Sequence, residues 1–318
     1  MDRLLAFILV FASSLAMAAG EKTPPLVDAG WLNNNLARED LVVLDVRSAI
    51  DNGGDRSSFQ SAHIHGAIYS SYTGDGWRES RDGVAGLLPP VASLERLIGS
   101  LGISNDNTVV IVPAGTGVTD FGSAARVYWT FRVLGHDSVT ILNGGFAGWK
   151  AAGFEVASGA GNQRAVTQFE GTLQQNLIAS LEEVEQARGT QAQLVDARPS
   201  DYFRGVNQSP AARAPGTIPD SRSLPHLDFL GERNQVWYLN EDTITAQVNK
   251  AELNPDARTI AFCNTGHWAA TDWFVLSELA GFQEVALYDG SMAEWSQDSS
   301  RPLQVAKKGL GKVLDWFN

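Results

Sequence analysis

Cysteine and basic residues are both scarce in this 318-residue sequence. It contains a single cysteine, Cys263, which excludes an intramolecular disulfide and a cysteine-rich zinc site. Its 24 lysines and arginines are outnumbered by 36 acidic residues, so the formal net charge is -12. Because a surface this negative repels polyphosphate, we expect no nucleic-acid partner. The lone thiol is therefore either a packing residue or the centre of the chemistry.

Long apolar runs are missing after the first twenty residues, which argues against a polytopic membrane protein. The N-terminus itself has the parts of a secretory signal: basic Arg3, an apolar run over 4–15 and small residues at Ala16 and Ala18. The run is shorter than the ~20 residues that a spanning helix needs. We expect residues 1–19 to be a signal peptide, and the mature chain to be periplasmic or secreted with no membrane attachment.

The sequence is long enough for two domains, and it repeats itself. Single cores rarely exceed ~250–300 residues, and a 44% hydrophobic content is enough to form cores. Residues 44–47 (LDVR) recur as 195–198 (VDAR), and 143–149 recur as 289–295, each time about 150 residues later. We therefore expect homologous domains at 24–155 and 176–305, a linker at 156–175 and a tail at 306–318.

Each copy alternates strand-like and helix-like segments. Short apolar runs typical of buried strands occupy 109–112 in the first copy, and 193–196, 259–262 and 285–288 in the second. Helical patterns begin at residue 244 and span 270–279, where Gly281 is the expected stop. This alternation predicts the α/β class, with a parallel sheet in each copy covered by helices on both faces. In such sheets, ligands bind beyond the carboxyl ends of the strands.

Cys263 stands at one of these strand ends. It follows the strand expected at 259–262 and precedes a helix that starts near Ala269. The loop between them has small or polar residues and a glycine, so its N–H groups can turn toward the sulfur and stabilise a thiolate. The alternative is a small buried packing residue. In the first copy Pro113, Ala114 and Gly115 follow the matching strand, and we predict that this copy is inactive because it lacks a nucleophile.

These segments together resemble those of tandem rhodanese-domain sulfurtransferases, the thiosulfate and 3-mercaptopyruvate sulfurtransferases. The resemblance covers about 26–303 and rests on the repeated Asp-x-Arg strand ends, on 62–67 (AHIHGA), on 143–149 and on 263–269, which is similar to C-x-x-G-x-x-A. It implies two tandem rhodanese-like domains. It also implies that Cys263 accepts a sulfane sulfur from a small donor as a persulfide and passes it to a thiophilic acceptor such as cyanide or a thiol. Neither a metal nor an organic cofactor is expected.

The resemblance also indicates which residues bind the donor. Besides Cys263, the loop residues expected at the substrate are Asn264, Thr265, Gly266, His267, Trp268 and Ala269. The family's R-[FY]-x-G segment is shifted here, so that its substrate arginine falls on Tyr202. Arg204 and Arg213 are candidates for the missing anion-binding role, and the alternative for each is an ordinary solvated arginine.

The loop has no lysine or arginine, and this composition limits the charge that can hold a dianionic donor. His267 either tunes the thiolate or polarises the substrate, or it points to solvent. Trp268 is expected to be a wall of the pocket. We expect thiosulfate to be turned over with a high KM that improves as the pH falls through the imidazole pKa.

Two other functions are alternatives to sulfur transfer. A phosphatase of the same fold needs Cys-x5-Arg to hold phosphate, and the position six after Cys263 is Ala269, which disfavours it. A non-enzymatic persulfide or redox carrier for a partner protein is not separated from an enzyme by the sequence; turnover with small donors separates the two. The Asp45/Arg47 and Asp196/Arg198 pairs are expected to lock strand ends to neighbouring loops.

Overall fold

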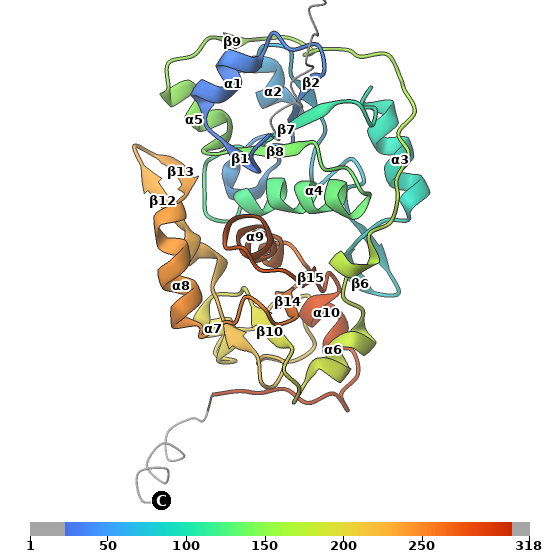
Figure 1. The fold of residues 1–318 in the computed structure, drawn as a ribbon, viewed down its shortest axis with the longest axis vertical. Helices are drawn as coiled ribbons and strands as arrows, with labels where there is room; N and C mark the ends of the chain where they lie inside the picture. The colour runs from blue at the N-terminus through green and yellow to red at the C-terminus, as the bar shows by residue number, and fades with distance from the viewer. Residues whose placement is uncertain (1–22, 307–318) are drawn as a thin grey trace, which may run out of the picture.

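The computed structural model of the protein describes residues 23–306. The expected signal peptide at 1–19 and the part of the expected tail after residue 306 lie outside the described residues. In Figure 1 the N-terminal domain fills the upper part of the view and the C-terminal domain the lower part. They meet along helices α4 (Phe121–Val133) and α9 (Trp268–Phe274). Within 23–306 no helix is both long enough and apolar enough to cross a membrane.

The N-terminal domain is built on a parallel sheet of five strands in the order β1-β8-β7-β2-β4. Alternate residues of its buried central strands face opposite helical layers: Val43 packs with α1, α2 and α5, whereas Leu44 lies in the cluster that includes α3 and α4. The sheet strands are β1 (Leu26–Val27), β2 (Leu41–Asp45), β4 (Ile68–Tyr69), β7 (Thr108–Val112) and β8 (Val139–Leu142). The helices besides α4 are α1 (Ala29–Asn35), η1 (Ile50–Asn52), α2 (Arg56–Ser61), α3 (Val91–Ser100) and α5 (Gly145–Ala151). Smaller pairs are β3 (His63–Ile64) with β9 (Val156–Ala157), and the hairpin of β5 (Glu79–Arg81) and β6 (Val84–Leu87).

The C-terminal domain repeats this plan with a parallel sheet of four strands in the order β11-β10-β14-β15. Ile260 of β14 packs with α6 and α10, and Ala261 lies in the cluster that holds α8 and α9. The strands are β10 (Gln193–Asp196), β11 (Arg222–Ser223), β14 (Thr259–Phe262) and β15 (Val285–Leu287), with a hairpin of β12 (Leu230–Arg233) and β13 (Val236–Leu239). The helices besides α9 are η2 (Gln175–Leu177), α6 (Leu181–Ala187), α7 (Ser200–Phe203), η3 (His226–Phe229), η4 (Glu241–Thr243), α8 (Ile244–Lys250), the π-helix η5 (Val275–Leu279) and α10 (Ser291–Trp295).

The two domains share one hydrophobic core where α4 packs against α9. Phe274 of α9 meets two rings of α4: that of Tyr128, edge-on at 4.9 Å between centroids, and that of Phe121 at 5.8 Å. Such edge-to-face pairs add about 0.5–1.5 kcal/mol each beyond their buried area. The packing holds the start of α9, and with it the cysteine loop, against the N-terminal domain.

The predicted α/β class, with parallel sheets covered on both faces, is confirmed. The strands predicted at 193–196 and 259–262 coincide with β10 and β14 residue for residue. As expected, the Asp-x-Arg pairs lock strand ends to loops. Arg47 donates to Asp45 and to the Ala62 carbonyl, and Arg198 donates to Asp196 and to the Gly216 carbonyl. These pairs therefore belong to the scaffold that positions the loops.

Candidate functional site

Cys263 lies directly after β14, with only 1% of its surface exposed. Its N–H donates to Ser291 Oγ at 3.0 Å, and the N–H of Gly266 donates to the same oxygen at 3.1 Å. The Ser291 hydroxyl in turn donates to the Tyr288 carbonyl at 2.8 Å. One buried hydroxyl at the start of α10 thus fixes both ends of the cysteine loop, residues 263–267, to the end of β15.

The conformation of the loop depends on Gly266. Gly266 has a φ of +70°, and a Cβ at this position would collide with the guanidinium of Arg126, so only glycine fits. Within the described part of the chain, the N–H groups of Thr265, His267 and Trp268 donate to no protein acceptor. Free N–H groups at the start of a helix stabilise negative charge close to them. The structure therefore brings the expected donor-binding residues 264–269 together at the end of β14.

The N-terminal domain contributes Arg126, whose side chain is fully buried on α4. Its guanidinium donates to the Gly266 carbonyl at 3.1 Å and to the Gly86 carbonyl at 3.0 Å. It also pairs with Asp289 at 3.4 Å. Because buried charges are stable only when they are paired and hydrogen-bonded, these contacts hold the arginine between the cysteine loop and the β5–β6 hairpin.

The β5–β6 hairpin of the N-terminal domain lies against the cysteine loop. Leu88, just after β6, donates its N–H to Asp289 at 2.6 Å. Gly86 has a φ of +91°, and a Cβ there would collide with the Thr265 carbonyl oxygen. The backbones of the two domains thus come so close at this point that only a residue without a side chain fits at position 86.

His267 is buried between the domains and does not point to solvent. Its Nε2 lies 2.9 Å from the Thr119 carbonyl, which can only accept, so Nε2 carries the proton. Nδ1 then accepts from the Tyr72 hydroxyl at 2.8 Å. Burial, and next the positive charge of Arg78, lower the pKa of His267 to about 3. The expected improvement of thiosulfate binding through protonated His267 is therefore wrong, because burial keeps this imidazole neutral near neutral pH.

Trp268 forms an aromatic wall beside the loop, on the side of the C-terminal domain. Its ring stacks on His226 at 4.8 Å with planes 9° apart, and meets Tyr202 edge-on at 6.0 Å. His226 is itself fixed by a 2.9 Å contact between Nδ1 and the Ala197 carbonyl. Tyr202, which stands where the family has its substrate arginine, therefore packs against the wall and supplies no charge.

The two arginines that the sequence offered as anion-binding groups have exposed side chains. Arg204 is exposed, and its Nε donates to the Ser200 carbonyl at 3.0 Å. Arg213 is also exposed, and only its backbone N–H is bonded, to Ser296 Oγ at 2.8 Å. Within residues 23–306 neither guanidinium makes a hydrogen bond or ion pair with the cysteine loop. In place of these two, Arg198 comes close to the loop, 3.5 Å from Asn264 Oδ1.

Sequence reasoning missed several groups around Cys263. Asp289 and Ser291 belong to the repeated segment 289–295, which was a detectable signal, whereas Arg126 and Tyr72 belong to the N-terminal copy and had none. Asp272 on α9 is fully buried, and neither of its carboxyl oxygens has a hydrogen-bond partner in the described part of the chain. Burial first, then the nearby Cys263, raise the pKa of this carboxyl well above its ordinary value. A buried carboxyl whose charged form is disfavoured therefore lies near the cysteine.

The corresponding loop of the first copy, 113–120, is filled by a carboxylate of its own. Asp51 of η1 accepts from the N–H groups of Thr119 at 2.6 Å and Asp120 at 2.9 Å. A Cβ at Gly117 would collide with the same carboxylate. The donors that could bind a substrate anion in this copy are therefore already occupied, which agrees with the absence of a nucleophile.

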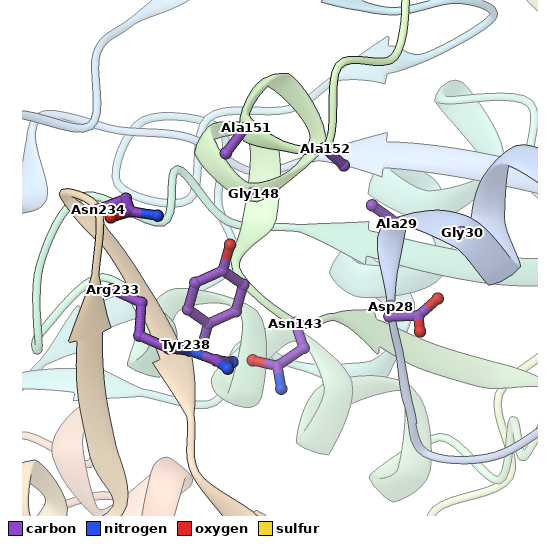
Figure 2. Close-up of a pocket in the computed structure, with 10 residues that line it drawn as sticks. All are labelled: Asp28, Ala29, Gly30, Asn143, Gly148, Ala151, Ala152, Arg233, Asn234 and Tyr238. Atoms are coloured by element: carbon purple, nitrogen blue, oxygen red, sulfur yellow. The ribbon is translucent and has the colours of Figure 1, made fainter.

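A separate hollow of about 470 Å³ lies where the β12–β13 hairpin meets the N-terminal domain. Figure 2 shows Tyr238 and Arg233 of the hairpin on one side, and α5 with the start of α1 on the other. The Asn143 side chain fixes the hairpin through both its amide atoms, which bond the Leu239 backbone at 3.0 and 2.8 Å. No residue of the cysteine loop lines this hollow. It belongs to the domain contact and not to the cysteine.

Comparison with known proteins gives a family for both halves. The model of the Rhodanese-like domain matches residues 28–152 and 180–298. The chain is 30% identical over 323 residues to thiosulfate/3-mercaptopyruvate sulfurtransferase 2 of Arabidopsis thaliana, with 92% of each chain covered. It is 33% identical to the thiosulfate sulfurtransferase of Cricetulus griseus, over 81% of this chain and 85% of that one.

Solved structures share the fold at lower identity. The 3-mercaptopyruvate sulfotransferase SseA from Escherichia coli superposes with a TM-score of 0.70 at 23% identity, covering 86% of this chain and all of the other. The anaerobic ergothioneine biosynthesis enzyme from Chlorobium limicola has a TM-score of 0.75 at 20% identity, covering 89% of this chain and 70% of that one. At these identities the likeness establishes the fold and nothing about substrates.

Proposed function

This chain belongs to the rhodanese family of sulfurtransferases, and we propose that it moves a sulfane sulfur from a small anionic donor to a thiophilic acceptor through a persulfide on Cys263. The observation that supports this most is the position of the one thiol of the chain. Cys263 lies after β14, at a loop whose N–H groups at Thr265, His267 and Trp268 are free to hold negative charge.

The chemistry with thiosulfate is a displacement at sulfur. The Cys263 thiolate attacks the outer sulfur, the S–S bond of the donor breaks, and sulfite leaves with the electron pair of that bond. The product is a Cys263 persulfide anion, so charge and atoms balance. Cyanide then attacks the outer persulfide sulfur, and thiocyanate leaves as the thiolate returns. A thiol acceptor is converted to its own persulfide in the same way.

With 3-mercaptopyruvate the thiolate attacks the thiol sulfur of the donor, and the carbon–sulfur bond breaks. The thiol proton ends on the methyl carbon of pyruvate, so no oxidant or reductant is needed. In both cases hydrogen-bond donors stabilise the persulfide anion, and a second negative charge beside it would destabilise it. The free loop N–H groups supply the donors, and burial disfavours a second negative charge on Asp272.

A steady-state panel tests the proposal directly. Thiosulfate and 3-mercaptopyruvate are the donors, with cyanide and a small thiol as acceptors, for the wild type and for Cys263→Ser. We expect turnover with at least one donor, parallel double-reciprocal lines typical of ping-pong kinetics, and no turnover in the serine variant. Sulfur loading without turnover in any donor–acceptor pair would favour the carrier function instead.

A further inference from the structure

We propose that Arg78 of the inactive domain is the cation that binds the anionic group of the sulfur donor. The inference rests on the proposed function and deepens it, because it names the group that recognises the donor. It also places that group outside the catalytic domain, in the loop between β4 and β5.

The backbone that carries Arg78 is firmly anchored. The preceding residue, Trp77, is fully buried, and its Nε1 donates to Ser70 Oγ at 2.9 Å. The Trp77 ring lies 5.9 Å from that of Phe131 on α4. Arg78 is therefore held at a fixed place beside the domain contact, with a half-buried side chain.

The Arg78 guanidinium is connected to the cysteine loop through the side chain of Tyr72. Its Cζ lies 4.9 Å from the centre of the Tyr72 ring, and the Tyr72 hydroxyl is bonded to His267 of that loop. The positive charge of Arg78 contributes, after burial, to lowering the pKa of His267 to about 3. Burial lowers the pKa of Arg126, and the charge of Arg78 adds a smaller contribution in the same direction. An electric field that reaches both groups also reaches a donor seated against the loop.

Arg78 differs from the other guanidinium groups near the loop in having no counter-charge. Arg126 pairs with Asp289, and Arg198 pairs with Asp196. Within residues 23–306 Arg78 makes neither a hydrogen bond nor an ion pair, so its five N–H donors are available to a ligand. A planar guanidinium can bind the sulfonate of thiosulfate or the carboxylate of mercaptopyruvate through two parallel hydrogen bonds.

This arrangement explains how the site manages without a basic residue in its loop. Tyr202 replaces the family's arginine, and Arg204 and Arg213 are exposed without contact to the loop. A cation supplied by the neighbouring domain, Arg78, fills the same need.

The test is the KM of each donor in Arg78→Gln and Arg78→Lys, with Arg56→Gln as the matched control. Arg56 also lies over a tyrosine of this domain, Tyr69 at 4.7 Å, but its side chain is 59% exposed. We expect Arg78→Gln to raise KM by about 10- to 100-fold, the loss of a charged hydrogen bond, with kcat changed less than about twofold. Arg78→Lys keeps the positive charge but loses the planar guanidinium, so its KM should lie between those of the wild type and Arg78→Gln. The KM of Arg56→Gln should equal that of the wild type.

The two donors distinguish which anion is bound. A rise in KM for thiosulfate alone shows that Arg78 binds the sulfonate, and a rise for mercaptopyruvate alone shows that it binds the carboxylate. A rise in KM for both donors shows a general anion site. Each of these results supports the proposal. An unchanged KM for both donors in Arg78→Gln, in a protein that still forms the persulfide at saturating donor, would overturn it. A wild-type protein that forms no persulfide with either donor would instead overturn the proposed function.

Discussion

At the scale of single residues, the side chains that hold the Cys263 loop are neutral or paired. His267 is an uncharged imidazole bonded to Tyr72 and to the Thr119 carbonyl. Arg126 is matched by Asp289, and the hydroxyl of Ser291 ties the two ends of the loop. Because none of these contacts requires a charge to appear near neutral pH, the shape of the loop is independent of pH there.

The neutral state of His267 predicts how stability depends on pH. Its pKa is about 3 when folded, against about 6.5 unfolded, so between these values the unfolded chain binds more protons. Stability is therefore full above pH 6.5 and is lost as the pH falls toward 3. In His267→Gln, which can still donate to Thr119, the free energy of unfolding should fall less steeply between pH 7 and pH 4. Denaturant titrations at each pH measure this, and a variant curve parallel to that of the wild type would contradict it. The exposed His65→Gln serves as the control.

At the scale of elements, local patterns predicted the strands but not the contacts between domains. The segments at β10 and β14 are buried on both faces, so their apolar composition alone identified them as strands. Arg126 lies in the middle of a buried helix, where no periodicity distinguishes a charged residue that serves the other domain. The sequence offered Arg204 and Arg213 because they lie near the expected segment, and within residues 23–306 neither guanidinium bonds to the loop.

The β5–β6 hairpin provides a matched test of this contact. In Gly86→Ala the new Cβ meets Thr265, whereas in Gly76→Ala it meets nothing within 4 Å, although both glycines have positive φ, +91° and +96°. Both variants bear the strain of a left-handed backbone, about 1–2 kcal/mol, but only Gly86→Ala pushes the hairpin off the cysteine loop. We expect kcat/KM for sulfur transfer to fall by about tenfold or more in Gly86→Ala relative to Gly76→Ala. Equal values in the two variants would show that the hairpin does not position the loop.

At the scale of the whole molecule, the two copies of the fold contribute different groups to one site. The C-terminal copy keeps the thiol, while the N-terminal copy fills its own loop with Asp51 and supplies Tyr72, Arg78 and Arg126 to the other. With a net charge of -12, the molecule as a whole repels an anionic donor. Cations placed at the domain contact therefore decide where an anion can bind.

Export is a further proposal at this scale, supported by the basic, apolar and small-residue parts of positions 1–19. We expect the mature protein recovered from a Gram-negative host to begin within a few residues of Ala19 and to fractionate with the periplasm or the medium. N-terminal sequencing of the purified protein measures this. A chain that retains Met1 in the cytosolic fraction would contradict the proposal.

The most direct test of the account is the intact mass of the protein after exposure to a sulfur donor. The wild type, incubated with thiosulfate or 3-mercaptopyruvate and freed of donor, should gain the mass of one sulfur atom and lose it when cyanide is added. Cys263→Ser should gain nothing, because an alcohol cannot form the persulfide. A sulfur adduct that persists in Cys263→Ser, or a wild type that gains no mass with either donor, would contradict the central claim.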